Sequence, residues 1–169
     1  CKSLNIPCVA FRYQNVYGPG QSLTNPYTGI LSIFSSRIMQ QKAVNIFEDG
    51  KESRDFVFID DAVNATILGI EKSEADFCSF NVGTGKATTV LEVAQVLMKN
   101  YGKESPLEIS GQYRKGDIRH NFADMHLIKE KLGFIPTVDF ETGIAQFCNW
   151  VKSQEIKTDQ YEQSLAEMK

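Results

Sequence analysis

The sequence lacks the features that mark several large classes of protein. It contains no apolar run near the ~20 residues that span a bilayer, and no basic segment followed by an apolar one as in a leader peptide. Lysine and arginine (18 residues) do not outnumber aspartate and glutamate (21), and the net charge is −3. Such a chain has no general field that attracts nucleic acid or an anionic membrane. We therefore expect neither a membrane span nor a nucleic-acid partner.

Cysteine is scarce, and its four positions are far apart in the chain. Cys1, Cys8, Cys78 and Cys148 include no pair with the short spacing of a zinc or redox site, so we expect no metal site. A reduced cysteine among apolar residues packs as a small hydrophobe, which fits a reducing, cytoplasmic location. The chain opens directly on the strand-like segment 6–11, and we expect that it is a part of a longer protein.

Composition and pattern together predict an α/β fold. A hydrophobic content of 42% in 169 residues is ordinary for one globular domain. Strand patterns alternate with helical ones, which favours a sheet with a parallel component. Strands are expected at 6–13, 44–47, 54–59, 77–82 and 107–109, and helices at 28–42, 60–72, 88–101, 124–133 and 140–153. Residues 14–27 are expected to form a loop, and the segment after Ile156 a frayed polar tail.

Capping residues set several of the expected helix ends. Thr89 and Glu92 have the spacing of a capping box, and Gly102 follows that helix as a C-terminal glycine should. Asp60 or Asp61 is expected to cap the second helix, and Asp124 the fourth, which should stop at Gly133.

A glycine-rich turn for a nucleotide is missing. The segment Gly83-Thr84-Gly85-Lys86 resembles part of a P-loop, but Phe80 stands where the first glycine of that motif belongs. Ala87 replaces the required serine or threonine. The segment is therefore interpreted as a turn.

Polar residues gather in three segments, at 12–21, 54–56 and 114–120. The first follows a buried strand directly, and ligands of α/β sheets bind beyond the carboxyl ends of strands. Arg54 and Arg114 could together hold a diphosphate, because a guanidinium makes bidentate contacts to phosphate oxygens. The alternative is that each arginine pairs with a nearby carboxylate, Asp55 or Asp117, or lies on a solvated surface.

Five segments in order resemble the signatures of extended short-chain dehydrogenase/reductases that act on sugar nucleotides. These segments are 12–21, 49–61, 80–85, 114–117 with 123–124, and 132–136. The resemblance implies the last strands of a Rossmann-type parallel sheet plus a small α/β substrate-binding domain. It assigns 1–14 and about 77–102 to the NAD-binding domain, 15–76 and 103–156 to the sugar-nucleotide-binding domain, and 157–169 to a polar tail.

The resemblance also implies roles for particular residues. The substrate-binding residues would be Asn15, Asn45, Phe47, Arg54, Arg114 and Asp117, and the cofactor-binding residues Tyr13 and Gln14. The two arginines would hold the diphosphate, Asn15 the diphosphate or sugar, and Asp117 a ribose hydroxyl or Arg114. Phe47 would pack on the pyrimidine base, with core packing as its alternative, and Asn45 would act largely through its backbone. Tyr13 and Gln14 would lie against the nicotinamide end of NAD.

No catalytic residue is expected in this chain. The family's Tyr-x-x-x-Lys pair and glycine-rich NAD fingerprint would lie upstream of Cys1, and no tyrosine here has a lysine four residues later. NAD would be bound mostly by that upstream half.

The implied function is a part in an NAD-dependent 4-epimerase of a UDP- or dTDP-sugar, a homodimer when full length. The subclass is favoured because 114–120 and 22–29 look most like epimerase sequences. A dehydratase or decarboxylase of the same family and a non-catalytic sugar-nucleotide sensor remain open.

Overall fold

The computed structural model describes residues 1–23, 29–113 and 116–154, which form a mixed α/β fold as expected. The strands are β1 (Ala10–Tyr13), β2 (Asn15–Tyr17), β3 (Val44–Ile46), β4 (Ser53–Arg54), β5 (Phe56–Phe58), β6 (Ser79–Val82), β7 (Thr88–Thr89), β8 (Leu107–Ile109) and β9 (His120–Asn121). The helices are α1 (Ile30–Met39), α2 (Ile59–Glu71), α3 (Val90–Tyr101), α4 (His126–Leu132) and α5 (Phe140–Lys152), with 3-10 turns at Lys2–Leu4 and Ser73–Ala75. None of these helices is long and apolar enough to cross a membrane.

The strands pair across long stretches of sequence. Parallel pairs join β1 to β6, β2 to β5 and β3 to β8, and β4 lies between antiparallel β7 and parallel β9. The expected loop at 14–27 is wrong at its start, because Asn15–Tyr17 forms β2 and runs alongside Phe56–Phe58. A three-residue strand with a polar first residue has too little pattern to be read from sequence.

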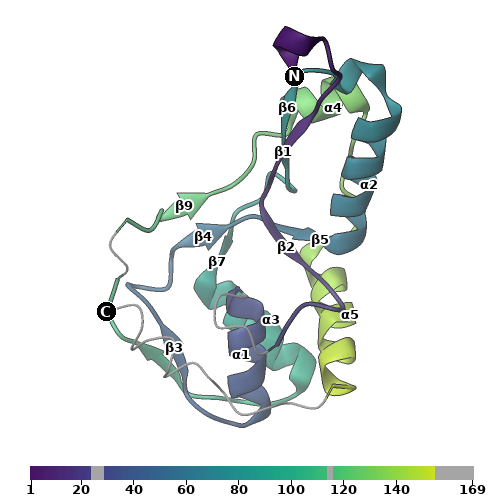
Figure 1. Ribbon diagram of the computed structural model, residues 1–169. Helices are drawn as coiled ribbons and strands as arrows, with labels where there is room; N and C mark the ends of the chain where they lie inside the picture. Colours follow the sequence, from purple (N-terminus) through teal and green to yellow (C-terminus); the bar gives the residue numbers. More distant parts are fainter. Residues whose placement is uncertain (24–28, 114–115, 155–169) are drawn as a thin grey trace.

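The elements gather into two groups, each with its own core (Figure 1). The smaller group contains β1, β6, α2 and α4, and its buried residues include Phe80, Val82 and Phe134. Gly69 lets α2 lie close to β1, because a Cβ at this position would come within 2.3 Å of the Phe11 ring.

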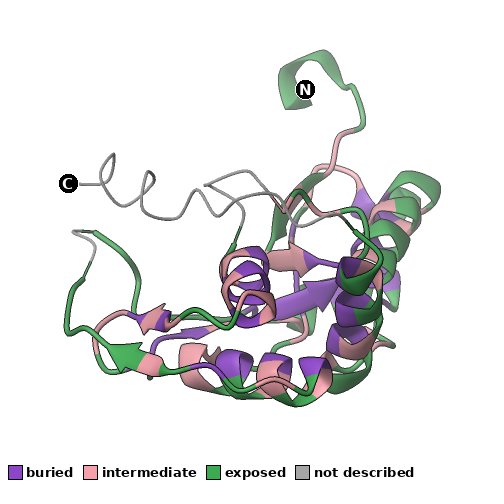
Figure 2. Ribbon diagram, turned by 90° about the horizontal axis from the view of Figure 1, so that it is seen from below, coloured by how far each residue is buried: buried purple, intermediate pink, exposed green. Residues whose placement is uncertain are grey.

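The larger group packs α1, α3 and α5 with β2, β3 and β5. Figure 2 shows its buried residues on the strands and on the helix sides that face one another. Helix α3 contacts α1 and α5 here. The division into a cofactor part and a substrate part stays a prediction.

Local signals fixed the ends of α3. Thr89 Oγ1 accepts a hydrogen bond from Glu92 N, and Glu92 accepts one from Thr89 N, so the predicted capping box is confirmed. Gly102 follows the helix in the left-handed region, with φ 62°. Gly133 likewise ends α4, with φ 66°.

The predicted aspartate caps of α2 and α4 are wrong. Helix α2 begins at Ile59 after Phe58, and no side chain caps it. Asp61 is instead buried and accepts hydrogen bonds from Thr137 N at 2.9 Å and Val138 N at 3.0 Å. It therefore fastens α2 to the segment before α5. Helix α4 begins at His126, two residues after the start of the expected range, with Met125 at its N-cap, although Asp124 accepts from His126 N.

Replacing Thr89 with alanine is expected to lower the free energy of unfolding by about 1 kcal/mol, because an N-cap hydroxyl is lost. Urea unfolding of the full-length protein would measure the change. Gln95→Ala, at an exposed position of the same helix, is the control and should change little. Equal midpoints for Thr89→Ala and wild type would contradict the role of the cap.

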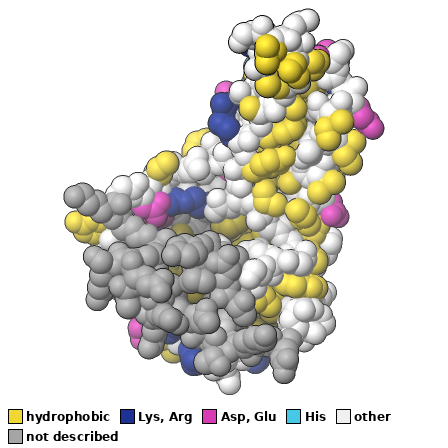
Figure 3. Space-filling model, in the orientation of Figure 1, with side chains coloured by type: hydrophobic (Ala, Val, Ile, Leu, Met, Phe, Trp, Pro, Cys, Tyr) yellow, Lys and Arg dark blue, Asp and Glu magenta, His cyan; other side chains and the backbone are white. Residues whose placement is uncertain are grey.

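Apolar side chains lie exposed over the smaller group. Leu4 is 74% exposed, Ile6 50% and Ile70 76%, and Figure 3 shows a band of hydrophobic side chains over this part. Within the described residues, β1 pairs with β6 alone, so its other edge offers unpaired backbone groups.

The isolated 169-residue chain is therefore expected to form oligomers or aggregates, since exposed apolar surface and open strand edges associate readily. Light scattering at high protein concentration would detect them. A clean monomer under those conditions would contradict this prediction.

Candidate functional site

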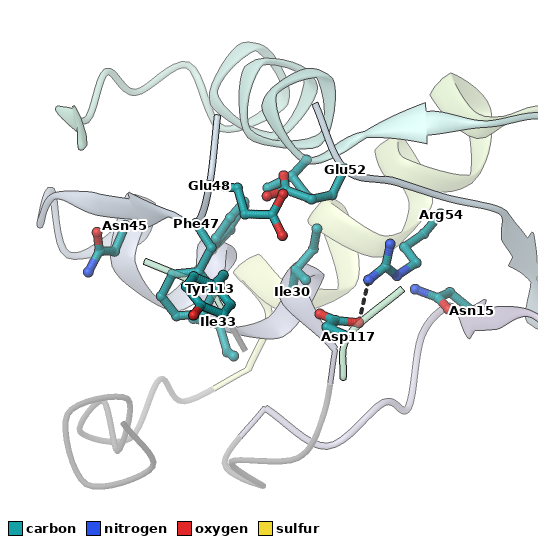
Figure 4. A pocket seen from close by; sticks show the side chains of 12 residues that line it. Asn15, Ile30, Ile33, Asn45, Phe47, Glu48, Glu52, Arg54, Tyr113 and Asp117 are labelled. Atoms are coloured by element: carbon teal, nitrogen blue, oxygen red, sulfur yellow. Dashed lines mark hydrogen bonds and ion pairs between the residues drawn. The ribbon is translucent and has the colours of Figure 1, made fainter. Parts of the chain in front are cut away.

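A pocket of about 240 Å³ lies in the larger group, between α1, β3 and the end of β4 (Figure 4). It is lined by five of the residues that the sequence singled out: Asn15, Asn45, Phe47, Arg54 and Asp117. Its other lining residues are Ile30, Ile33, Phe34, Glu48, Glu52, Val90 and Tyr113.

The sheet pairings bring these residues together. Asn15 opens β2, which pairs with β5, and β5 comes just after Arg54 at the end of β4. Asn45 lies in the middle of β3, and Phe47 directly follows that strand. Figure 4 shows Asn45, Phe47 and Tyr113 at one end of the pocket, and Arg54 and Asn15 at the other.

Arg54 is held firmly at its end of the pocket. Its Nη2 lies 2.8 Å from Asp117 Oδ1, and its Nη1 donates to the carbonyls of Ser53 at 2.9 Å and Arg119 at 3.1 Å. The side chain is only 18% exposed. A guanidinium has more N–H donors than these contacts use, so Arg54 can still bind an anion in the pocket.

Asp55 serves the fold, so the alternative in which it pairs with Arg54 is wrong. This fully buried carboxylate accepts hydrogen bonds from Thr84 N and Oγ1, Gly85 N and Ala123 N. It thereby fastens the β4–β5 junction to the turn at 83–85. A Cβ on Gly83 would come within 2.4 Å of Asp55 Oδ2, which explains a glycine at this position.

The other site residues expected from sequence lie elsewhere. Tyr13 and Gln14 are at the carboxyl end of β1 and do not line this pocket. The Tyr13 hydroxyl is 2.6 Å from Thr66 Oγ1, and Gln14 Oε1 is buried with no partner among the described residues. Arg114 lies outside the described residues, so its place and its pairing with Asp117 stay predictions.

Three carboxylates gather beside the pocket. Oxygens of Glu48, Asp49 and Glu52 lie within 4.8 Å of one another. Arg119 pairs with Asp49 Oδ2 at 2.7 Å and with Glu48 Oε2 at 2.5 Å. The hydrogen bond from Arg119 lowers the pKa of Asp49, so two of the three carboxylates already have a cationic partner.

Glu52 is the site residue that the sequence analysis missed. It is 7% exposed, and neither carboxylate oxygen has a hydrogen-bond partner in the described part of the chain. Burial is the main cause that raises the pKa of this carboxyl, and the charges of Glu48 and Asp49 also raise it, while the N–H of its own backbone and the charge of Arg119 lower it. No sequence signal distinguishes it, because a glutamate beside a turn usually lies in solvent.

Comparisons with known proteins point in one direction. A model of the NAD dependent epimerase/dehydratase family matches residues 1–83. A dTDP-L-rhamnose 4-epimerase of Burkholderia thailandensis is 38% identical over 148 residues, which cover 88% of this chain and 40% of that protein. A UDP-glucose 4-epimerase of Mycolicibacterium smegmatis is 31% identical over 89% of this chain and 47% of its own length.

A solved structure agrees with these relatives. The crystal structure of a UDP-glucose 4-epimerase with UDP-glucose from Thermotoga maritima matches with a TM-score of 0.79 and 36% identity. The matched region covers 90% of this chain and 48% of the Thermotoga maritima chain. The chain thus spans about half the length of the proteins it matches.

Proposed function

We propose that this chain, which belongs to the NAD dependent epimerase/dehydratase family, binds the nucleotide diphosphate of a UDP- or dTDP-sugar in an NAD-dependent 4-epimerase. The observation that carries the proposal is the pocket itself. Four separate segments place Asn15, Asn45 with Phe47, Arg54 and Asp117 around one space of about 240 Å³.

The two ends of the pocket suit the two ends of such a nucleotide. Arg54 supplies a fixed positive charge and N–H donors for the diphosphate, and the amide of Asn15 lies beside it. At the other end, the ring of Phe47 and the backbone near Asn45 suit a flat pyrimidine base. Asp117 orients Arg54 through their ion pair.

The role of this chain in the reaction is to hold the nucleotide while the sugar stays free to turn. Binding energy from the nucleotide, which does not react, can position the sugar, which does. The contacts to the nucleotide can stay the same while the sugar turns from one face to the other. The family's tyrosine and lysine would lie outside this sequence, as would most of the NAD site.

The residues at the end of β1 fit a nicotinamide. Gln14 Oε1 is a buried acceptor without a partner in the described part of the chain, and it suits a carboxamide N–H. Tyr13 offers a 43% exposed ring at the same edge. NAD, when bound, supplies the hydride chemistry, and these two residues would orient its nicotinamide end. We further propose that the full-length protein is a homodimer in the cytoplasm.

The isolated chain is expected neither to epimerise a sugar nucleotide nor to bind NAD tightly, because it contains no Tyr-x-x-x-Lys pair and no glycine fingerprint. Assays of turnover and of NAD binding on the purified chain test this. Measurable epimerisation by that chain would contradict it.

Calorimetric titration of the full-length protein with UDP and dTDP tests the binding proposal directly. At least one should bind more tightly than the free nucleoside, because the diphosphate reaches Arg54. Equal affinity for nucleoside and nucleoside diphosphate would overturn the assignment. A dehydratase, a decarboxylase and a sensor remain the alternatives. Analysis of the reaction product would separate the enzymes, and the full-length sequence would show whether the Tyr-x-x-x-Lys pair of an enzyme is present.

A further inference from the structure

Glu52 is a buried hydrogen-bond acceptor without a donor in the described part of the chain. Its side chain is 7% exposed, and neither oxygen has a hydrogen-bond partner within residues 1–23, 29–113 and 116–154. A carboxylate in this position is costly for the folded protein, because buried charges need donors. Such a group, on the wall of a pocket, points to a ligand that carries donors.

The other carboxylates of the pocket already have donors. Asp117 accepts from Arg54 Nη2 and from Ile118 N, both at 2.8 Å. Glu48 accepts from Arg119 Nη1. Glu52 therefore differs from Asp117 and Glu48, because neither of its oxygens has a donor in the described part of the chain.

The position of Glu52 selects the part of the ligand that it meets. Figure 4 shows Glu52 between Phe47 at one end of the pocket and Arg54 at the other, beside Glu48. A diphosphate has no N–H or O–H to offer and is repelled by a carboxylate, so it belongs at Arg54. The group that joins a base at Phe47 to a diphosphate at Arg54 is the pentose, whose hydroxyl groups are donors.

Resting on the function proposed above, we propose that Glu52 holds the pentose of the nucleotide, with its carboxylate accepting a hydrogen bond from the 3′-hydroxyl. Among the groups of the pentose, this hydroxyl is the donor that UDP and dTDP share. A ribonucleotide offers its 2′-hydroxyl as a second donor, and the carboxylate has a second oxygen that can accept from it. The residue thereby fixes the distance of the sugar diphosphate from the base and rejects nucleotides that lack the hydroxyl.

This contact can be tested from both sides. One experiment removes the hydroxyl from the ligand, and the other removes the carboxylate from the protein. Calorimetry on the full-length protein would compare UDP with 3′-deoxy-UDP, and dTDP with its 3′-deoxy form. Wild type should bind the 3′-deoxy ligand roughly ten- to a hundredfold more weakly, as expected for a hydrogen bond to a charged group. Glu52→Met, which keeps the length of the side chain, should bind the two ligands nearly equally.

The control is Glu108→Met, at an exposed position outside this pocket, which should keep the full wild-type preference. Without ligand, Glu52→Met should unfold at the same or a higher temperature than wild type, because the unpartnered buried carboxylate is gone. A purely structural residue would lose stability instead, without discriminating between the two ligands.

The outcomes separate the two proposals. If wild type and Glu52→Met show the same preference for the hydroxyl, or if wild type shows none, Glu52 does not hold the pentose, and the binding of UDP or dTDP still stands. If wild type binds neither nucleotide diphosphate, the proposed function fails and this inference fails with it.

Discussion

Replacing Asp55 with alanine is expected to lower the free energy of unfolding by about 4 kcal/mol. The substitution leaves four donors without their acceptor, namely Thr84 N and Oγ1, Gly85 N and Ala123 N. Each buried donor left unsatisfied costs about 1–3 kcal/mol, with partial relief from entering water. A loss of this size is a large share of the roughly 5–15 kcal/mol that stabilises a typical domain.

Urea unfolding of the full-length protein would measure the effect of Asp55→Ala. Asp60→Ala is the matched control, because Asp60 is exposed in the first turn of α2. Its loss should cost less than about 1 kcal/mol, the usual effect of a charge near a helix end. Similar midpoints for the two variants would show that the turn at 83–85 does not depend on Asp55.

Replacing Arg54 with alanine is expected to weaken nucleotide-sugar binding about tenfold to a hundredfold. The reason is the loss of charge-assisted hydrogen bonds, each worth roughly 1.5–3 kcal/mol. Because the diphosphate is bound alike in the ground and transition states, most of the loss should appear in KM. NAD content should not change if, as proposed, most of the NAD site lies outside this sequence. Arg114→Ala is expected to behave in the same way.

Arg12→Ala is the control for Arg54→Ala. Arg12 also makes a hydrogen bond to a neighbouring side chain, Asn81 at 2.8 Å, but it lines no part of this pocket. It should leave KM for the sugar nucleotide near the wild-type value. If Arg54→Ala instead keeps the wild-type KM and loses bound NAD, the diphosphate assignment is wrong, and Arg54 serves the cofactor or the fold.

The sequence by itself determined the features that depend on near neighbours in the chain. The capping box of Thr89 and Glu92 and the glycines that end α3 and α4 rest on contacts within about one helical turn. The α/β alternation follows from local periodicity in the same way. The family is also visible in the sequence, because its signatures keep their order from 12–21 to 132–136.

Only the tertiary structure decided which distant groups meet. In the sequence, Asp55 was a possible partner for Arg54, and Asp61 a possible helix cap. Both instead accept hydrogen bonds from residues about 29 to 77 positions away. The pairing of Arg54 with Asp117 spans 63 positions, and β2 exists only because β5 lies beside it. Glu52 became a candidate through its burial, its place in the pocket and the lack of a donor among the described residues. Donors and acceptors have the same chemistry wherever they stand in a sequence, so packing selects their partners and decides which of them is left for a ligand.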